Sequence, residues 1–140
     1  VSQVEDLPEA IGQLVEDLRV NTLMTAEVES LEQIAGLVNE PEALAIFHIA
    51  QEALNNVSKH SKATRVAVKL TGNTEYVTLE VRDNGVGFDG ETASGEKHGL
   101  RNMRDRARSV GATLVCESAP GRGTLIRAEL PVTRKEVANG

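Results

Sequence analysis

A chain of 140 residues is long enough for one domain with a single hydrophobic core. Its formal net charge of −6 argues against nucleic acid or an anionic membrane as a partner, and its aromatic content of 2% argues against stacking on single strands. The single cysteine excludes an internal disulfide, and no group of cysteines and histidines has zinc-site spacing. Because no apolar run could span a bilayer and no signal peptide is visible, we expect a cytoplasmic domain that makes no membrane contact. The chain starts at Val1 rather than at methionine, so we expect it to be part of a longer protein.

The first forty residues predict a helix, a strand and a connection. Residues 8–19 have apolar side chains at helical spacing and a proline near the first turn, which predicts a helix. Residues 21–30 are partly β-branched and predict an edge strand. A series of acidic residues then predicts a solvated connection. These residues are Glu27, Glu29, Glu32 and Glu40.

A long amphipathic helix is predicted from Pro41 to His60. Its apolar arc consists of Ile46, Ala50, Ala53, Leu54 and Val57. Its opposite face carries His48, Glu52, Asn56 and Lys59. Such a face can simply be solvated, but adjacent asparagines at 55 and 56 are poor helix formers in mid-helix. The carboxylate, carboxamide and ammonium groups suit activation of a nucleophile, Mg²⁺ ligation and phosphate binding, so both interpretations stay open at this point.

A hairpin follows, and it directs one carboxylate toward the core. Residues 65–70 and 76–82 alternate between apolar and polar side chains, and residues 71–74 favour a turn. By the same alternation Asp83 continues the apolar face of the second strand, where a carboxylate needs a partner. A glycine-containing loop comes next, and the polar residues 89–98 predict a mobile flap.

The next helix is predicted to run from Gly99 to a C-terminal glycine at position 111, because the apolar period starts at Leu100. Free N–H groups at such a start would form an anion site. Four arginines at positions 101, 104, 106 and 108 predict a solvated or partner-facing surface.

A second hairpin is predicted from residues 112–117 and 124–130. Its alternation places Thr124 at the inner end of the last strand. Pro131 ends that strand, and residues 133–140 predict a frayed tail.

Four motifs in this order resemble the nucleotide-binding boxes of one superfamily. They are ExxxNxxKH at 52–60, DNGVGF at 83–88, HGL at 98–100 and GRGT at 121–124. Together they resemble the N, G1, G2 and final glycine boxes of the GHKL ATPases, and most of all the ATP-binding catalytic domain of bacterial sensor histidine kinases. The segments QEALNNVSKH and HGLRNMRDRA further resemble the nitrate-sensor and desaturation-sensor subtype.

The resemblance covers residues 8–131, so we expect residues 1–140 to form one ATP-binding domain with a tail from residue 132. It implies the Bergerat fold, an α/β two-layer sandwich in which helices cover one face of a mixed, mostly antiparallel sheet.

The resemblance also implies roles for individual residues. Asn56 is implied as the Mg²⁺ ligand, and Glu52 as the catalytic residue that polarises the attacking histidine imidazole. Asp83 is implied as the carboxylate that reads the adenine amino group, with Thr124 beside it, directly or through water. The other implied ATP contacts are Lys59, His60, Gly85, Gly87, His98, Gly99 and Leu100.

The activity implied is transfer of the γ-phosphoryl group of Mg·ATP to a histidine on a dimerisation domain of the same kinase, for onward transfer to a response regulator. The acceptor-histidine motif of the family has no match in this chain, so we expect no autophosphorylation of the 140 residues alone. The parent kinase could be membrane-anchored. A GHKL-type ATPase, an anti-sigma serine kinase and a non-catalytic nucleotide-binding or interaction module stay open as alternatives.

Overall fold

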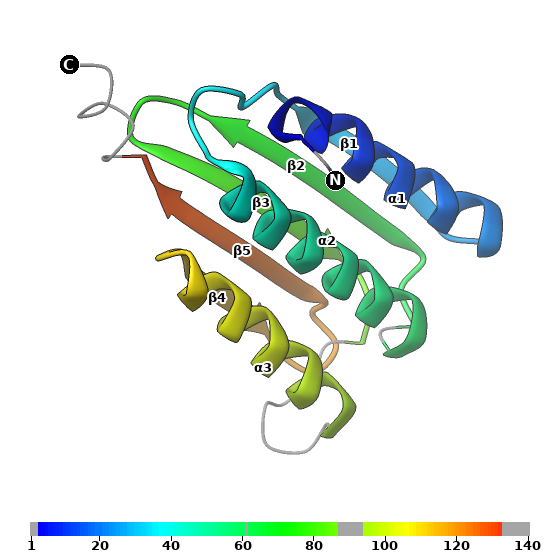
Figure 1. The fold of residues 1–140 in the computed structure, drawn as a ribbon. Helices are drawn as coiled ribbons and strands as arrows, with labels where there is room; N and C mark the ends of the chain where they lie inside the picture. Colours follow the sequence, from blue (N-terminus) through cyan, green and yellow to red (C-terminus); the bar gives the residue numbers. More distant parts are fainter. Residues whose placement is uncertain (1–2, 61, 87–93, 133–140) are drawn as a thin grey trace.

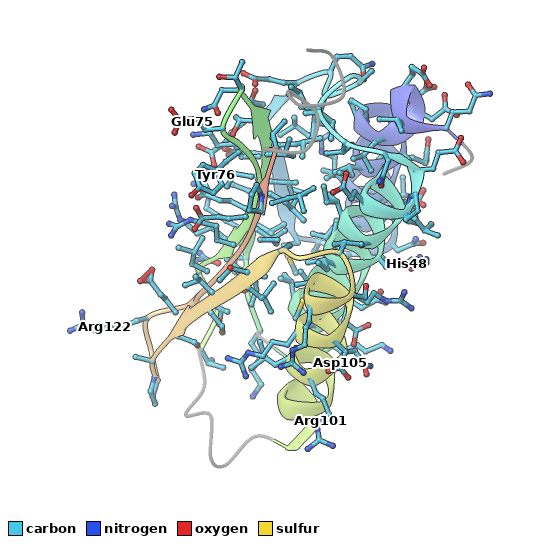
Figure 2. All side chains as sticks on the ribbon, turned by 60° about the vertical axis from the view of Figure 1, so that its left-hand side comes forward. His48, Glu75, Tyr76, Arg101, Asp105 and Arg122 are labelled. Atoms are coloured by element: carbon cyan, nitrogen blue, oxygen red, sulfur yellow. The ribbon has the colours of Figure 1, made fainter. Side chains whose placement is uncertain are left out.

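A single mixed β-sheet, covered on one face by α-helices, makes up the fold (Figure 1). The computed structural model describes residues 3–60, 62–86 and 94–132. The elements in chain order are a 3₁₀ turn (Val4–Asp6), α1 (Leu7–Asn21), β1 (Thr25–Leu31), α2 (Glu40–His60), β2 (Arg65–Gly72), β3 (Tyr76–Asp83), α3 (Ser94–Ser109), β4 (Thr113–Ser118) and β5 (Thr124–Pro131). Seen nearly edge-on, the sheet lies on one side and the helices on the other (Figure 2). The predicted two-layer α/β sandwich is confirmed.

The strands lie in the order β1-β2-β3-β5-β4. β1 is parallel to β2, and the other neighbouring pairs are antiparallel, as predicted for a mostly antiparallel mixed sheet. A parallel pair requires a crossover connection, which α2 supplies. Because β5 inserts between β3 and β4, the end of β3 lies beside the start of β5. This adjacency decides the composition of the candidate site.

The core lies between the helices and the sheet, and the predicted apolar arcs form it. The arc of α2 is buried throughout, which confirms the helical register inferred for this segment. Among the described side chains of α3, the buried ones are Leu100, Met103 and Ala107, three and four residues apart. The inner faces of both hairpins follow the predicted alternation, and the buried residues of β3 are Val77, Leu79, Val81 and Asp83.

The acidic segment was only partly predicted. Glu27 and Glu29 belong to β1, which starts at Thr25 and so later than expected. Both side chains are exposed, as the edge position of β1 allows, and Glu27 pairs with Arg65 of β2 at 2.9 Å. Their charge alone suggested a solvated connection. The strand was not visible locally, because the backbone partners of β1 lie in β2, about forty residues further along the chain.

The start of α3 was predicted wrongly. The helix begins at Ser94, five residues before Gly99. The apolar period begins only at Leu100, so periodicity could not detect a first turn made of polar residues and glycine. Once a helix is nucleated by packed residues, each further residue adds a hydrogen bond without needing apolar contact.

The C-terminal end of α3 was predicted correctly. Gly111 has a φ of 76°, and its N–H donates to the carbonyl of Arg108. The N–H of Ala112 donates to the carbonyl of Ala107, which completes a Schellman motif.

The end of the core lies at Val132, which is buried and donates its N–H to the carbonyl of Glu75. Residues 87–93, which include the first half of the flap predicted at 89–98, and the tail from residue 133 lie outside the described residues. The second half of that flap, residues 94–98, was predicted wrongly, because it belongs to α3. In the part of the chain that the structure describes, no helix is both long and apolar enough to cross a membrane.

Candidate functional site

A pocket that is partly open to solvent lies between the sheet and helices α2 and α3. Its lining residues come from four elements: Ala53, Asn56 and Val57 from α2, Val81 and Asp83 from β3, Leu100 from α3, and Thr124 and Ile126 from β5. The walls are mostly apolar, with three polar side chains among them. A concave apolar pocket with a few convergent polar groups is the usual form of a small-molecule site.

Asp83 is the carboxylate of this pocket, and its predicted inward orientation is confirmed. Its residue is 9% exposed, and its Oδ1 accepts the N–H of Gly85 at 2.7 Å. Burial raises the pKa of the Asp83 carboxyl above its usual range, while the backbone N–H groups of Gly85 and Thr124 partly lower that pKa again. The carboxylate is therefore held in place by backbone donors and keeps further acceptor capacity for a ligand.

Thr124 lies directly opposite Asp83 across the β3–β5 pair. Ser118 lies directly opposite Thr124 across the β4–β5 pair, and the two hydroxyl oxygens are 2.8 Å apart. Ser118 also donates to the carbonyl of Gly123 at 3.1 Å. Asp83, Thr124 and Ser118 thus form a row across three strands. Sequence reasoning missed Ser118, because only the register of the last hairpin brings it to Thr124.

Gly123 fixes the distance between the ends of β3 and β5. A Cβ atom on this residue would overlap the carbonyl oxygen of Asp83, and its φ of 75° is unfavourable for other residues. Nearby, the N–H of Gly121 donates to the carbonyl of Val86, which ties the loop after β3 to the second hairpin.

Asn84 anchors the same loop from the other side, and its role was also missed. Its Oδ1 accepts the N–H groups of Thr64 and Arg65, and its Nδ2 donates to the hydroxyl of Thr64. The loop that follows Asp83 is therefore held by the segment before β2 as well as by the β4–β5 hairpin.

Asn56 faces α3, and a glycine makes room for it. A Cβ on Gly99 would lie 2.5 Å from Asn56 Nδ2 and 2.9 Å from its Oδ1. The polar face of α2 is therefore not a freely solvated face, since His48, Glu52 and Asn56 are all half-buried. Their carboxylate and amide groups are directed to the α2–α3 side of the molecule.

Glu52 lies one turn before Asn56 but lines a different hollow. This groove on the outer side of α2 and α3 is lined by His48, Gln51, Glu52, Asn102, Met103, Asp105 and Arg106. Figure 2 shows His48 and Asp105 on the helical side of the molecule, away from the sheet. The structure therefore brings together Asn56, Asp83, Leu100 and Thr124 in one pocket, and places Glu52 beside it.

Two expected phosphate contacts need correction. Gly99 and Leu100 lie in the second turn of α3, where each N–H is used by the carbonyl four residues earlier. Their backbone donors are therefore not free helix-start groups, although both residues are buried next to the pocket. The N–H groups that have no acceptor within α3 are those of its first turn, residues 94–97.

The remaining implied ATP contacts do not line the pocket or lie outside the described residues. Lys59 is exposed on α2, and Gly85 is buried and bonded to Asp83. Gly87 and the side chains of His60 and His98 lie outside the described residues.

The comparisons with known proteins agree with this geometry. The family model described as "Histidine kinase-, DNA gyrase B-, and HSP90-like ATPase" matches residues 42–134, which include α2, the pocket and both hairpins. This match covers more than half of the chain.

The chain belongs to this ATPase family.

The family binds ATP, and it is the superfamily whose boxes the four motifs resemble. Curated relatives include the sensor protein VraS of Staphylococcus epidermidis, 35% identical over 138 residues, which cover 97% of this chain and 38% of that protein. The VraS of Staphylococcus aureus is 34% identical over 134 residues, with 94% of this chain and 37% of that protein covered. The chain thus spans less than two fifths of these relatives.

Solved structures show the same fold. The blue-light activated histidine kinase of Erythrobacter litoralis EL346 superposes with a TM-score of 0.76 at 20% identity over 94% of this chain and 43% of that one. The histidine kinase AdeS of Acinetobacter baumannii gives a TM-score of 0.71 at 13% identity over 93% of this chain and 65% of that one. The similarity to both confirms the predicted architecture.

The described residues of this site fit a magnesium ion as a partner of a nucleotide. Within the described residues, no group of three or more His, Cys, Asp or Glu side chains could hold a metal ion. The carboxamide oxygen of Asn56 is the pocket's oxygen donor on α2. Mg²⁺ commonly binds through one or two protein oxygens, several waters and substrate phosphates, so one carboxamide suffices for an ion carried by ATP.

Proposed function

We propose that this chain is the ATP-binding catalytic domain of a sensor histidine kinase, which binds Mg·ATP and donates the γ-phosphoryl group to a histidine of a separate dimerisation domain. The observation that carries the proposal is the pocket in which buried Asp83, from the sheet, faces the α2–α3 layer that bears Asn56. Membership of the ATPase family and similarity to sensor proteins support it.

Asp83 accepts a hydrogen from the exocyclic amino group of adenine in this proposal. Gly85 supports that role because its N–H holds Oδ1 in place, and a carboxylate that accepts the N–H groups of Gly85 and Thr124 still has lone pairs for a further donor. Thr124 acts beside Asp83, and the apolar residues Val57, Val81 and Ile126 contact the faces of the base.

Asn56 would hold Mg²⁺, which when bound neutralises charge on the triphosphate. Lys59 lies one turn further along α2, where its ammonium group can reach phosphate oxygens. His60, Gly87 and His98 are kept as proposed ATP contacts on their motif positions alone. For Gly99 the proposed role changes, because it gives Asn56 space rather than a free N–H group.

Glu52 is proposed to orient and polarise the incoming histidine imidazole. Its place in the α2–α3 groove leaves the carboxylate accessible from outside the pocket, where an acceptor on another domain would approach. A positioned carboxylate that removes or orients a proton commonly contributes about 10²–10⁴-fold in rate. The phosphorylated histidine would then supply a response regulator.

The experiment combines the 140-residue chain, γ-labelled ATP with Mg²⁺, and a histidine-bearing dimerisation fragment of a sensor histidine kinase. We expect label on the fragment, in an acid-labile and alkali-stable form, and none on the chain itself. Asp83→Asn serves as the matched control that should abolish transfer.

Two results would contradict the proposal. Label on the 140-residue chain alone would mean that one of its own histidines is the acceptor. Absence of ATP binding by calorimetry, in a chain that is folded by circular dichroism, would refute the nucleotide site itself.

A further inference from the structure

The polar row Asp83–Thr124–Ser118 contains a residue that does not line the pocket. Asp83 and Thr124 are the polar side chains on the sheet wall of the pocket, while Ser118 lies beside Thr124 on the edge strand β4, where all three residues line a second, more open hollow. The following inference rests on the proposed ATP site.

The hydrogens in this row can be assigned by counting. A hydroxyl has one hydrogen to donate and can accept further hydrogen bonds. Ser118 Oγ lies 3.1 Å from the carbonyl oxygen of Gly123, which can only accept, so the serine hydrogen is directed there. Either hydroxyl could donate across the 2.8 Å contact between Ser118 Oγ and Thr124 Oγ1, but both contacts are hydrogen bonds at once when Thr124 is the donor and Ser118 the acceptor.

This assignment fixes what Thr124 offers to a ligand. With its hydrogen directed to β4, Thr124 presents only lone pairs to the pocket. The ionised Asp83 carboxylate also presents lone pairs, because it has no hydrogen to donate and the N–H groups of Gly85 and Thr124 occupy only part of its acceptor capacity. The sheet wall of the pocket is therefore an acceptor surface made of two neighbouring groups.

Such a wall distinguishes two kinds of purine. An amino group at position 6 brings two hydrogens to the acceptors, whereas a 6-oxo group places a third acceptor against them. A buried polar group left unpaired loses more than a formed hydrogen bond contributes, so a site of this kind rejects the wrong analogue.

We propose that Ser118 is a positioning residue that sets Thr124 as a hydrogen-bond acceptor, and so contributes to the selection of 6-amino over 6-oxo purine nucleotides. Without the Ser118 hydroxyl, the Thr124 hydrogen can rotate into the pocket. It would then donate to a 6-oxo group and compete with the 6-amino group.

The test measures the dissociation constants of ATP and inosine triphosphate for the wild-type chain and Ser118→Ala. We expect the preference for ATP to fall by about three- to tenfold, the effect of one hydrogen bond. Ser109→Ala, which removes an exposed hydroxyl bonded to the carbonyl of Arg106, should leave the preference unchanged. Ser118→Thr retains a hydroxyl at this position and should therefore keep the wild-type preference for ATP.

A double-mutant cycle separates positioning from a general structural effect. In a Thr124→Val background Ser118→Ala should no longer change the preference, because the hydroxyl on which it acts is gone. The ratio of the two constants is insensitive to any unfolded fraction, so a loss of stability alone cannot imitate the result.

The inference is overturned if Ser118→Ala leaves the ratio of the two dissociation constants unchanged, or if it weakens the binding of both nucleotides equally. It is also overturned if Ser118→Ala changes the ratio by the same factor in the Thr124→Val background. A folded wild-type chain that binds neither nucleotide would instead refute the proposed function.

Discussion

The backbone of Gly123 lies against the backbone of Asp83 so closely that a Cβ atom on Gly123 would overlap the Asp83 carbonyl oxygen. The same Cβ would lie 3.1 Å from the Asp83 carbonyl carbon and 3.2 Å from the Cα of Asn84. Backbone atoms cannot rotate away as a flexible side chain can. The glycine of the last hairpin thus determines how the carboxylate of the pocket is placed.

Gly123→Ala should therefore destabilise the chain and weaken ATP binding. An alanine at positive φ costs about 1–2 kcal/mol, and the overlap with Asp83 should bring the total loss in unfolding free energy to roughly 3 kcal/mol or more. Denaturant unfolding and calorimetric ATP titration measure the two effects. Gly121→Ala is the control, because Gly121 has a similar φ of 78° but open space around its Cβ position. Equal losses in the two variants would contradict the role of the contact.

Gly99→Ala should weaken the binding of Mg·ATP while leaving the helix intact. Alanine normally stabilises a helix interior by about 0.5–1 kcal/mol relative to glycine, but here its methyl group would displace the carboxamide of Asn56. Nucleotide titrations at several Mg²⁺ concentrations should show a changed metal dependence. The matched variant is Gly12→Ala on α1, whose Cβ would make only an ordinary contact of 3.5 Å with Leu31. This control should be slightly stabilised and bind normally, and a Gly99→Ala chain that behaves like it would show that Asn56 has no metal role.

Asp83→Asn should reduce ATP affinity by about ten- to a hundredfold, the usual effect of losing a charge-assisted hydrogen bond. In the nucleotide-free chain, by contrast, the same substitution should raise the free energy of unfolding at neutral pH. Because burial raises the pKa of Asp83 in the folded state, its ionised form destabilises the fold at neutral pH, and this cost disappears as pH falls through the raised pKa.

The stability of the wild-type chain relative to Asp83→Asn should therefore increase as the pH is lowered from 7 toward the ordinary range of aspartate. Thermal unfolding of both chains across this range, without nucleotide, measures the difference. A difference that grows in the opposite direction would mean that the folded state favours the charged form of Asp83.

Glu52→Gln should leave ATP affinity within a few-fold of the wild-type value and slow phosphoryl transfer by about 10²–10⁴-fold. The reason is its position, since Glu52 lines the α2–α3 groove and not the pocket that holds Asp83. Transfer to the histidine-bearing fragment is measured under single-turnover conditions. The control is Glu16→Gln, which changes an exposed carboxylate on α1. Transfer at the wild-type rate would remove Glu52 from the mechanism.

Part of the candidate site was accessible from the sequence because it depends on local periodicity. Strand alternation alone directs Asp83 and Thr124 to the core, and helical spacing alone separates the apolar arc of α2 from the face with Glu52 and Asn56. The C-terminal glycine of α3 is similarly local, because a left-handed residue is needed wherever a helix ends in this way.

Other features were decided only by the tertiary structure. The Ser118–Thr124 contact depends on the register of β4 against β5, and the approach of Gly123 to Asp83 depends on β5 lying beside β3. The contact between Gly99 and Asn56 depends on how closely α3 packs on α2. Each relationship joins residues that no helical or strand period connects, so only the packing of whole elements brings them together. For the same reason the sequence determined which residue types face the pocket, while the fold determined which of them touch.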